Sequence, residues 1–249
     1  VLTDKINLNA SVGRYFKVAP NTSLGFKDLN GNYVNKEADY IGANHYVAGI
    51  EYLPSESTRF TAEVFYKKYF NVPISIQKGL SLSNLGADFN ILGNEPIISN
   101  GKGRSYGYEL FAQQKLTDRF FGVASYSFFR SAYTDINGTY IKSSWENIHV
   151  LSLTGGYKFN KNWEFGIKYR FQGGTPYTPY NMDASRINFL TQGLGVLDYN
   201  KINTLRLPNY HSSDIRIDKK YNYKKILENI CTELKSIVTL QNKIIYNGC

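Results

Sequence analysis

Hydrophobic and polar residues alternate strictly along several stretches of this chain. The clearest stretch is 162–172, where five large apolar side chains alternate with Glu, Gly, Lys, Arg and Gln. A period of two places successive side chains on opposite faces of a β-strand, so this stretch predicts a strand with one apolar face. The same pattern predicts seven more strands, at 5–17, 44–53, 58–70, 104–116, 119–133, 148–159 and 209–221. The chain is therefore predicted to be all-β.

Short and long connections alternate between the predicted strands. The short turns are 54–57, 117–118 and 160–161, and the long loops are 18–43, 71–103, 134–147 and 173–208. This alternation places every long loop at one end of the sheet, which is typical of membrane barrels and is not expected of β-sandwiches or soluble propellers. We therefore predict a partial antiparallel transmembrane β-barrel with about eight long strands visible, short turns at one rim and long loops at the other.

Aromatic residues gather near the ends of the predicted strands. Amphipathic rings favour the boundary between lipid and headgroup, so this placement predicts interfacial girdles. A soluble β-protein with an aromatic core is the alternative, and the alternation of loop lengths argues against it. The predicted girdle residues are Tyr15, Phe16, Tyr69, Phe70, Phe120, Phe121, Phe128, Phe129, Tyr157, Phe159 and Trp163.

The opposite face of the predicted sheet carries many ionisable side chains. Such groups need water or an oppositely charged partner, so this face should line a watery lumen or form a lattice of paired charges. We expect most of them to line and stiffen the barrel wall, with ligand contact as the weaker hypothesis. The candidate ligand-binding residues are Glu63, Glu109, Arg170, Asp214 and Arg216 on the strands, and Tyr177 and Tyr180 in the loop after residue 172.

Composition narrows the class further. The chain is 42% hydrophobic and 15% aromatic, with a mean hydropathy of −0.37, which is too aromatic for a disordered chain and too polar for a helical membrane protein. The formal net charge of +9 first suggests nucleic acid, but six Lys and only two Glu lie in residues 219–249. The rest of the chain has no basic block, so no nucleic-acid partner is predicted.

Several stretches of this sequence resemble a known family. The run YVAGIEYLPSESTRFTAEVFYKKYFNVPIS at 46–75 is similar to the barrel of TonB-dependent outer-membrane receptors of the Bacteroidetes type. Residues 101–116, 143–181 and 206–223 support the resemblance in the same order and spacing. It implies a 22-stranded barrel in the outer-membrane lipid, filled by an N-terminal plug. It also implies uptake of a siderophore, haem, cobalamin or an oligosaccharide, driven through TonB.

The chain departs from the family in two respects. Eight strands are visible, and neither a plug nor a TonB-box peptide is recognisable. We therefore expect residues 1–223 to be a late portion of the barrel that does not transport by itself. The second departure is residues 224–249, where helical spacing relates Leu227, Cys231, Leu234, Val238, Gln241 and Ile245. This tail is predicted to be either an amphipathic helix or the product of a shifted reading frame.

Two other functions stay open from the sequence. One is a small self-standing porin or adhesin barrel, and the other is a barrel enzyme. The chain has three histidines, His45, His149 and His211, and no spacing typical of a zinc site. His211 and Asp214 fall on opposite faces of a strand, which makes a catalytic pair geometrically poor, so we predict no enzyme and no cofactor. Gly101 and Gly103 do not form a nucleotide motif, and we interpret them as flexible loop positions.

Overall fold

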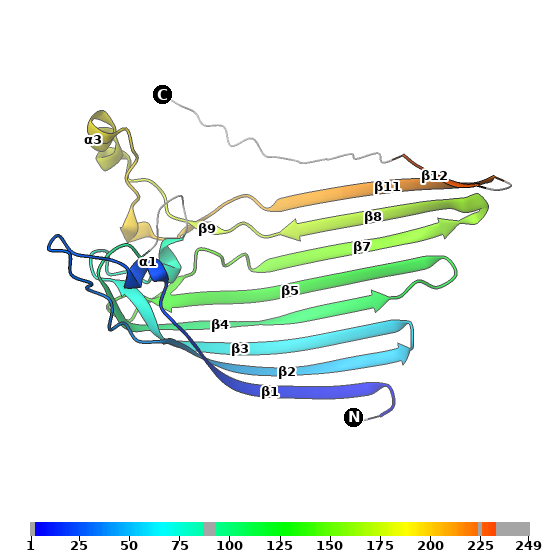
Figure 1. The fold of residues 1–249 in the computed structure, drawn as a ribbon, viewed down its shortest axis with the longest axis horizontal. Helices are drawn as coiled ribbons and strands as arrows, with labels where there is room; N and C mark the ends of the chain where they lie inside the picture. Colours follow the sequence, from blue (N-terminus) through cyan, green and yellow to red (C-terminus); the bar gives the residue numbers. More distant parts are fainter. Residues whose placement is uncertain (1–2, 87–92, 224–225, 233–249) are drawn as a thin grey trace.

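The computed structural model describes residues 3–86, 93–223 and 226–232, and most of them belong to one large antiparallel sheet (Figure 1). Its strands lie in the order β1-β2-β3-β4-β5-β7-β8-β11-β12, with the short β6 paired to β5, and β9 and β10 form a second sheet. The strands are β1 (Ile6–Lys17), β2 (Ile41–Ser55), β3 (Thr58–Ser75), β4 (Ile97–Gln114), β5 (Phe120–Thr134), β6 (Tyr140–Lys142), β7 (His149–Phe159), β8 (Trp163–Gln172), β9 (Pro176–Tyr177), β10 (Leu205–Arg206), β11 (Tyr210–Tyr223) and β12 (Ile226–Thr232). Within the described residues, β1 and β12 are the edges, so the sheet is open.

Short helices occupy the connections between the strands. They are α1 (Asn21–Leu24), α2 (Leu82–Leu85), α3 (Met182–Gln192) and the 3-10 turns η1 (Asn160–Asn162) and η2 (Tyr199–Lys201). In Figure 1, α3 stands apart from the large sheet, and its Ile187 and Leu190 are 72% and 88% exposed. No helix in the described part of the chain is long and apolar enough to cross a membrane.

All eight predicted strands are present, which confirms the all-β prediction. The largest differences are that β3 continues to Ser75 and β4 begins at Ile97. Their pairing extends through register shifts on both sides of Val72, in a stretch whose Asn, Pro and Gly residues are typical of turns. Gly101 and Gly103 therefore lie inside β4, and their interpretation as flexible loop positions is wrong.

The register separates apolar from polar side chains. Val64 pairs with Tyr108 on one side of the sheet, while Glu63 pairs with Glu109 on the other. We call these sides the apolar face and the polar face. The apolar face is widely exposed, with Val12 78% and Val64 57% accessible. A single-layer sheet with this much exposed apolar surface suits a membrane, where lipid covers that face.

The girdle prediction is wrong for four residues. Tyr15, Tyr69, Phe121 and Phe129 pair with residues of the polar face, at Ala43, Gly103, Gly156 and Gly107. Their sequence neighbours Phe16, Phe70, Phe120 and Phe128 lie on the apolar face, as predicted. The reason is geometric, because adjacent residues of a strand point to opposite faces and an aromatic doublet can give only one ring to a girdle.

The chain continues as a strand after Tyr223. β12 pairs antiparallel with β11, from Tyr223↔Ile226 to Ile217↔Thr232. The helical interpretation of the tail is therefore wrong over Ile226–Thr232, because the backbone hydrogen-bonding groups of this segment pair with β11 and not with one another. Residues 224–225 and 233–249 lie outside the described residues, so the reading-frame hypothesis and the boundary at residue 223 stay predictions.

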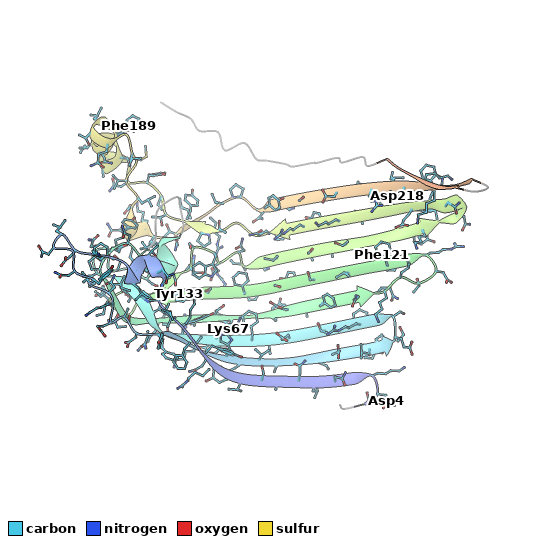
Figure 2. The ribbon with its side chains drawn as sticks, viewed as in Figure 1. Asp4, Lys67, Phe121, Tyr133, Phe189 and Asp218 are labelled. Atoms are coloured by element: carbon cyan, nitrogen blue, oxygen red, sulfur yellow. The ribbon has the colours of Figure 1, made fainter. Side chains whose placement is uncertain are left out.

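Buried side chains gather where the long loops meet the sheet, at the end opposite the short turns (Figure 2). The buried apolar residues include Val72, Ile74, Leu80, Leu82, Tyr133 and Ile202. The buried polar residues include Ser23, Asn35, Ser75, Asn84, Glu95, Ser131, Ser143, Glu146, Asn147 and Asn203. The main packed core of the described residues is thus a mixed polar and apolar one, built between the long loops and the ends of β3 and β5.

Candidate functional site

Buried asparagine side chains tie the long loops to one another. We call these loops, residues 18–40, 76–86, 93–96, 135–148 and 173–209, the collar. Asn35 connects the first loop to the second, because its Nδ2 donates to the carbonyl oxygens of Ser23 and Glu95, both at 2.8 Å. Its Oδ1 accepts a bond from the backbone N–H of Ile97 at 3.0 Å. All hydrogen-bonding groups of this buried amide are thereby used.

Asn203 ties the fourth loop to the second and third. Its Nδ2 donates to the carbonyl oxygen of Asn84 at 2.7 Å and to that of Lys142 at 2.8 Å. Asn84 in turn donates from its Nδ2 to the carbonyl oxygen of Tyr133 on β5, at 3.1 Å. Asn203 has φ of 53°, a left-handed conformation that Asn tolerates better than most residues.

A buried carboxylate provides a charged connection in the collar. The side chain of Glu146 is 3% exposed and binds two guanidinium groups, those of Arg130 at 3.1 Å and of Arg206. It also accepts a bond from the backbone N–H of Ser131 at 2.9 Å. Arg206 Nη1 donates to the carbonyl oxygens of Glu146 and Gly174, at 2.6 and 2.9 Å. Such a group is stable when buried only because its charge is balanced and hydrogen-bonded.

Five aromatic rings run across the polar face directly beneath the collar. We call Tyr15, His45, Tyr69, Tyr133 and Trp145 the aromatic arc. The distances between ring centroids are 4.6 Å for Tyr15–His45, 6.5 Å for His45–Tyr69, 5.4 Å for Tyr69–Tyr133 and 5.7 Å for Tyr133–Trp145. These rings come from β1, β2, β3, β5 and the loop after β6. Tyr133 is 6% exposed, whereas Tyr15 and Trp145 are 58% and 46% exposed.

Glycine makes the centre of the arc possible. Gly103 on β4 lies between Tyr69 and Tyr133 in the register. A Cβ at this position would lie 2.4 Å from Cδ1 of Tyr133 and 3.2 Å from Cβ of Tyr69. Only a residue without a side chain therefore allows the two tyrosines to meet across an intervening strand. Figure 2 labels Tyr133 at the collar end of the sheet, with Lys67 further along the strands.

The sequence contained a signal for part of this arc. Alternate residues of a strand share one face, so Tyr69 of β3 lies on the same face as Glu63 and Lys67. Tyr133 of β5 likewise shares the face of Ser131. Extending the alternation to the strand ends would have assigned both tyrosines to the polar face. Trp145 lies in a loop, where no periodicity indicates its direction.

Of the predicted site residues, Glu63 and Glu109 are brought together. They are direct register partners on β3 and β4 and lie on the polar face. Among the described residues neither carboxylate forms an ion pair, whereas the nearby Glu51 pairs with Arg59 at 2.6 Å. Like charges placed opposite each other destabilise a sheet, so this pair is an acidic site without a partner in the described chain.

Asp214 and Arg216 lie elsewhere on the polar face, on β11, between the middle of its pairing with β8 and the short-turn end. They line a hollow of about 410 Å³ together with Glu164, Lys168 and Asp218. Arg216 Nε lies 2.8 Å from Oδ2 of the buried Asp218, and Asp214 is the register partner of Lys168. This region resembles the predicted lattice of charges. Arg170 is the register partner of Ser212 and does not line the hollow.

Tyr177 and Tyr180 lie in the collar. Tyr177 pairs with Leu205 in the small sheet, and Tyr180 is 60% exposed beside Leu197. In the described residues, no ring contact joins either tyrosine to the aromatic arc. A role of the seven predicted residues in ligand binding stays a prediction.

The histidines do not form a catalytic centre. His45 belongs to the arc on the polar face. His149 and His211 lie on the apolar face, and the Nδ1 of each is 2.8 Å from a hydroxyl, that of Tyr126 and that of Tyr169. His211 and Asp214 are on opposite faces, as predicted. Within the described part of the chain, no group of three or more His, Cys, Asp or Glu side chains could hold a metal ion.

Comparison with known proteins identifies the architecture. The family described as "TonB dependent receptor-like, beta-barrel" matches residues 1–240. The ferripyoverdine receptor of the Pseudomonas aeruginosa outer membrane superposes with a TM-score of 0.60 at 18% identity, covering 89% of this chain and 26% of the receptor. The ferric-catecholate import receptor Fiu of E. coli K12 superposes with a TM-score of 0.62 at 14% identity, covering 89% of this chain and 27% of the receptor. The alcaligin receptor FauA of Bordetella pertussis superposes with a TM-score of 0.54 at 16% identity, covering 90% of this chain and 31% of the receptor. No curated protein matches the sequence significantly.

This chain thus spans about a third or less of each of these receptors. The family and its solved relatives are transport receptors rather than enzymes, which agrees with the prediction of a non-enzymatic chain. The open antiparallel sheet, its exposed apolar face and the family match over residues 1–240 lead to one conclusion. The chain belongs to the TonB-dependent receptor β-barrel family of the bacterial outer membrane.

Proposed function

We propose that this chain forms part of the barrel wall of a receptor that captures a scarce ligand outside the cell, and that the aromatic arc is its ligand platform. The observation that carries the proposal is the continuous contact of five rings on the polar face, under loops fixed by buried hydrogen bonds. In a barrel of this family the polar face lines the lumen, so a ligand descending between the loops meets the arc first.

The chemistry of the arc favours a ligand with flat conjugated rings. Each aromatic contact of this kind contributes about 0.5–1.5 kcal/mol beyond area burial, and phenol hydroxyls add hydrogen bonds. The relatives named above are described as receptors for ferripyoverdine, ferric catecholate and alcaligin. We therefore place a ferric siderophore first among the ligands that the family takes, ahead of haem, cobalamin and oligosaccharides.

The two tryptophans of the chain allow a direct test. Trp145 belongs to the arc, whereas Trp163 lies at the short-turn end, where Lys219 Nζ is 4.8 Å from its ring centroid. The chain is folded in detergent micelles and titrated with a ferric catecholate complex while tryptophan fluorescence is recorded. Trp163→Phe, which keeps Trp145 as the reporter, should show strong saturable quenching. Trp145→Phe, which keeps Trp163, should show weak quenching, and equal quenching in the two variants would contradict the platform.

The facing carboxylates of Glu63 and Glu109 favour the presence of a plug domain inside the barrel. Glu63 and Glu109 face the lumen and repel each other, so a basic side chain placed between them would relieve that repulsion. We propose that a plug domain supplies it, and that energised transport requires this plug and TonB in addition to the strands described.

A self-standing porin or adhesin is less well supported. The twelve-residue strand β1 has a single described partner, β2, and its other edge carries unpaired backbone groups. Such an edge in lipid is very costly, so we propose that it pairs with a further strand of a larger barrel. A gel in which the unheated chain runs as a compact, heat-modifiable monomer would favour the small-barrel alternative.

A further inference from the structure

The aromatic arc is exposed at its two ends and covered at its centre. Tyr15 and Trp145 are 58% and 46% exposed, whereas Tyr133 is only 6% exposed and Tyr69 is half-buried. Together with sulfur groups, phenol and indole side chains are the parts of a protein that lose an electron most readily. The arc therefore connects oxidisable rings at the surface of the wall to two covered phenols. We call Tyr69 and Tyr133 the tyrosine pair.

The tyrosine pair is in closer contact than other neighbouring tyrosines of the wall. Its ring centroids are 5.4 Å apart, and its ring planes are inclined by 41°. Among the described residues, the other ring contacts between tyrosines measure 6.0 Å and 6.4 Å and lie on the apolar face, where lipid or detergent covers them. They are Tyr108–Tyr126 and Tyr46–Tyr66. An oxidant dissolved in water therefore meets the tyrosine pair, on the polar face, rather than these two contacts.

Gly103 brings the two phenols to this distance. Tyr69 and Tyr133 are both register partners of Gly103, so their backbones are two strand spacings apart, about 10 Å. Their side chains share the space above the glycine, where an added Cβ would overlap Tyr133. In an oxidised phenol, the unpaired electron is spread over the oxygen and ring carbons that include the two Cε atoms. Two phenols held side by side in this way can couple with each other before either meets another molecule.

Trp145 provides a route by which an oxidant in water reaches the covered ring of Tyr133. The ring centroids of these two residues are 5.7 Å apart. When an oxidised indole takes an electron from a phenol that it touches, the phenol releases its proton to water. Trp145 is thereby restored and Tyr133 becomes the phenoxyl radical. Tyr69 needs no such route, because it is half-buried on the polar face.

We propose that the tyrosine pair is a modification site, at which a dissolved one-electron oxidant of the carbonate-radical class joins Tyr69 to Tyr133 as a dityrosine. Two oxidant radicals remove one electron from each phenol and become carbonate, which takes up the two phenolic protons as hydrogencarbonate. The two phenoxyl radicals form one bond between a Cε of each ring. The hydrogen on each of these carbons then moves to the oxygen of its own ring. The product keeps both hydroxyl groups and has lost two hydrogen atoms.

The modification needs no ligand on the arc, so it is independent of the proposed capture function. The new bond closes residues 70–132, which include the second long loop, into a covalent ring. A cross-link between distant residues restricts the unfolded chain, so the modified protein should unfold at a higher temperature. The centre of the arc is then fixed in the arrangement that Gly103 permits.

The test uses the full chain folded in detergent micelles, at a dilution at which it is monomeric. The oxidant is tris(bipyridine)ruthenium(III), a charged complex that is produced by light and persulfate and takes one electron at a time. The monomer is separated from any cross-linked dimer, digested, and analysed by fluorescence and mass spectrometry. The unaltered chain should show dityrosine emission. It should also give a linked peptide, containing Tyr69 and Tyr133, that is two hydrogen atoms lighter than its two parts.

Tyrosine variants identify the coupled rings. Tyr69→Phe and Tyr133→Phe should each lose the linked peptide and the dityrosine emission of the monomer. Tyr66→Phe is the matched control, because it removes one ring of a contact on the apolar face of the same strand and should keep the full yield. Gly103→Ala should lower the yield, since its methyl group separates the two rings. If Tyr133→Phe does not fold, Tyr69→Phe at the half-buried position tests the pair by itself.

Tryptophan variants test the route to the covered ring. Trp145→Phe should slow the formation of the link, because Tyr133 then contacts no exposed indole. Trp163→Phe removes a ring at the short-turn end and should leave the rate unchanged.

Four results would overturn the proposal. One is the absence of a linked peptide in the oxidised monomer of the unaltered chain, and another is dityrosine emission that persists in the Tyr69→Phe monomer. The third is a link between Tyr46 and Tyr66 that forms in larger amount than the link at the tyrosine pair. The fourth is an equal rate of linking in the two tryptophan variants, which would remove Trp145 from the route.

Discussion

Tyr69 and Tyr133 touch each other across an intervening strand, with ring centroids 5.4 Å apart, because Gly103 between them has no side chain. This contact joins the part of the aromatic arc on β1–β3 to the part on β5 and the loop after β6. The arc is therefore as sensitive to one glycine as to any of its rings.

Gly103→Ala should separate the two tyrosines. The added methyl would overlap the buried ring of Tyr133, and we expect a loss of about 1–3 kcal/mol of stability, as is common for overpacked sites. Quenching of Trp145 by the ferric catecholate complex should weaken as well. Gly166→Ala on β8 is the control, because its new Cβ would meet no atom closer than 3.7 Å. If both variants unfold at the same temperature as the unaltered chain, the steric argument fails.

Glu146→Gln should weaken the contacts that hold the long loops of the collar together. The substitution leaves Arg130 and Arg206 without their shared carboxylate in a buried position, and we expect a loss of about 3 kcal/mol. Limited proteolysis should then cut the loop 173–209 faster. Asp183→Asn is the control, because Asp183 and Arg186 are 3.9 Å apart and both highly exposed. That surface pair should contribute nothing measurable, and a comparable effect of both substitutions would refute the role of Glu146.

Asn203→Asp should break the hydrogen bonds that join the fourth long loop to the second and third. It keeps the size of the side chain but replaces the amide donor with a carboxylate oxygen, which faces the carbonyl oxygens of Asn84 and Lys142. We expect a cost of about 1–3 kcal/mol or more, from unsatisfied and repelling acceptors. Hydrogen exchange should speed up at residues 80–86 and 140–143. Asn188→Asp, whose amide bonds an exposed loop carbonyl at 2.9 Å, should change exchange only locally.

Glu63→Gln/Glu109→Gln should stabilise the chain in the absence of a plug. Removing two facing like charges relieves a repulsion of about 0.2–1 kcal/mol, which thermal unfolding in micelles can detect at low salt. The gain should disappear at high salt. Glu51→Gln is the opposite control, because it removes the partner of Arg59 and should not stabilise. A stabilisation that is independent of salt would point to a cause other than charge.

The period-two pattern predicted every long strand because each of them has one face toward an apolar environment, and burial enforces that alternation. The girdle prediction departed from this rule at the strand ends, where it assigned Tyr15 and Tyr69 to the lipid boundary although their alternation with Ser11 and Lys67 puts them on the polar face. The collar could not be predicted in this way. Asn35 and Asn203 act through carbonyl oxygens of distant loops, and backbone acceptors leave no trace in a sequence.

The collar has a consequence for the rate at which the proposed platform would take up a ligand. Each loop obtains hydrogen bonds from another loop, through Asn35, Asn203 and Glu146, so the loops lose their conformational freedom when the barrel wall forms. Little ordering then remains for the moment of encounter, and the entropic cost of binding falls on the ligand alone. On the proposed function, loops that are already ordered would let a scarce ligand bind in a single collision, without a slower rearrangement of the loops.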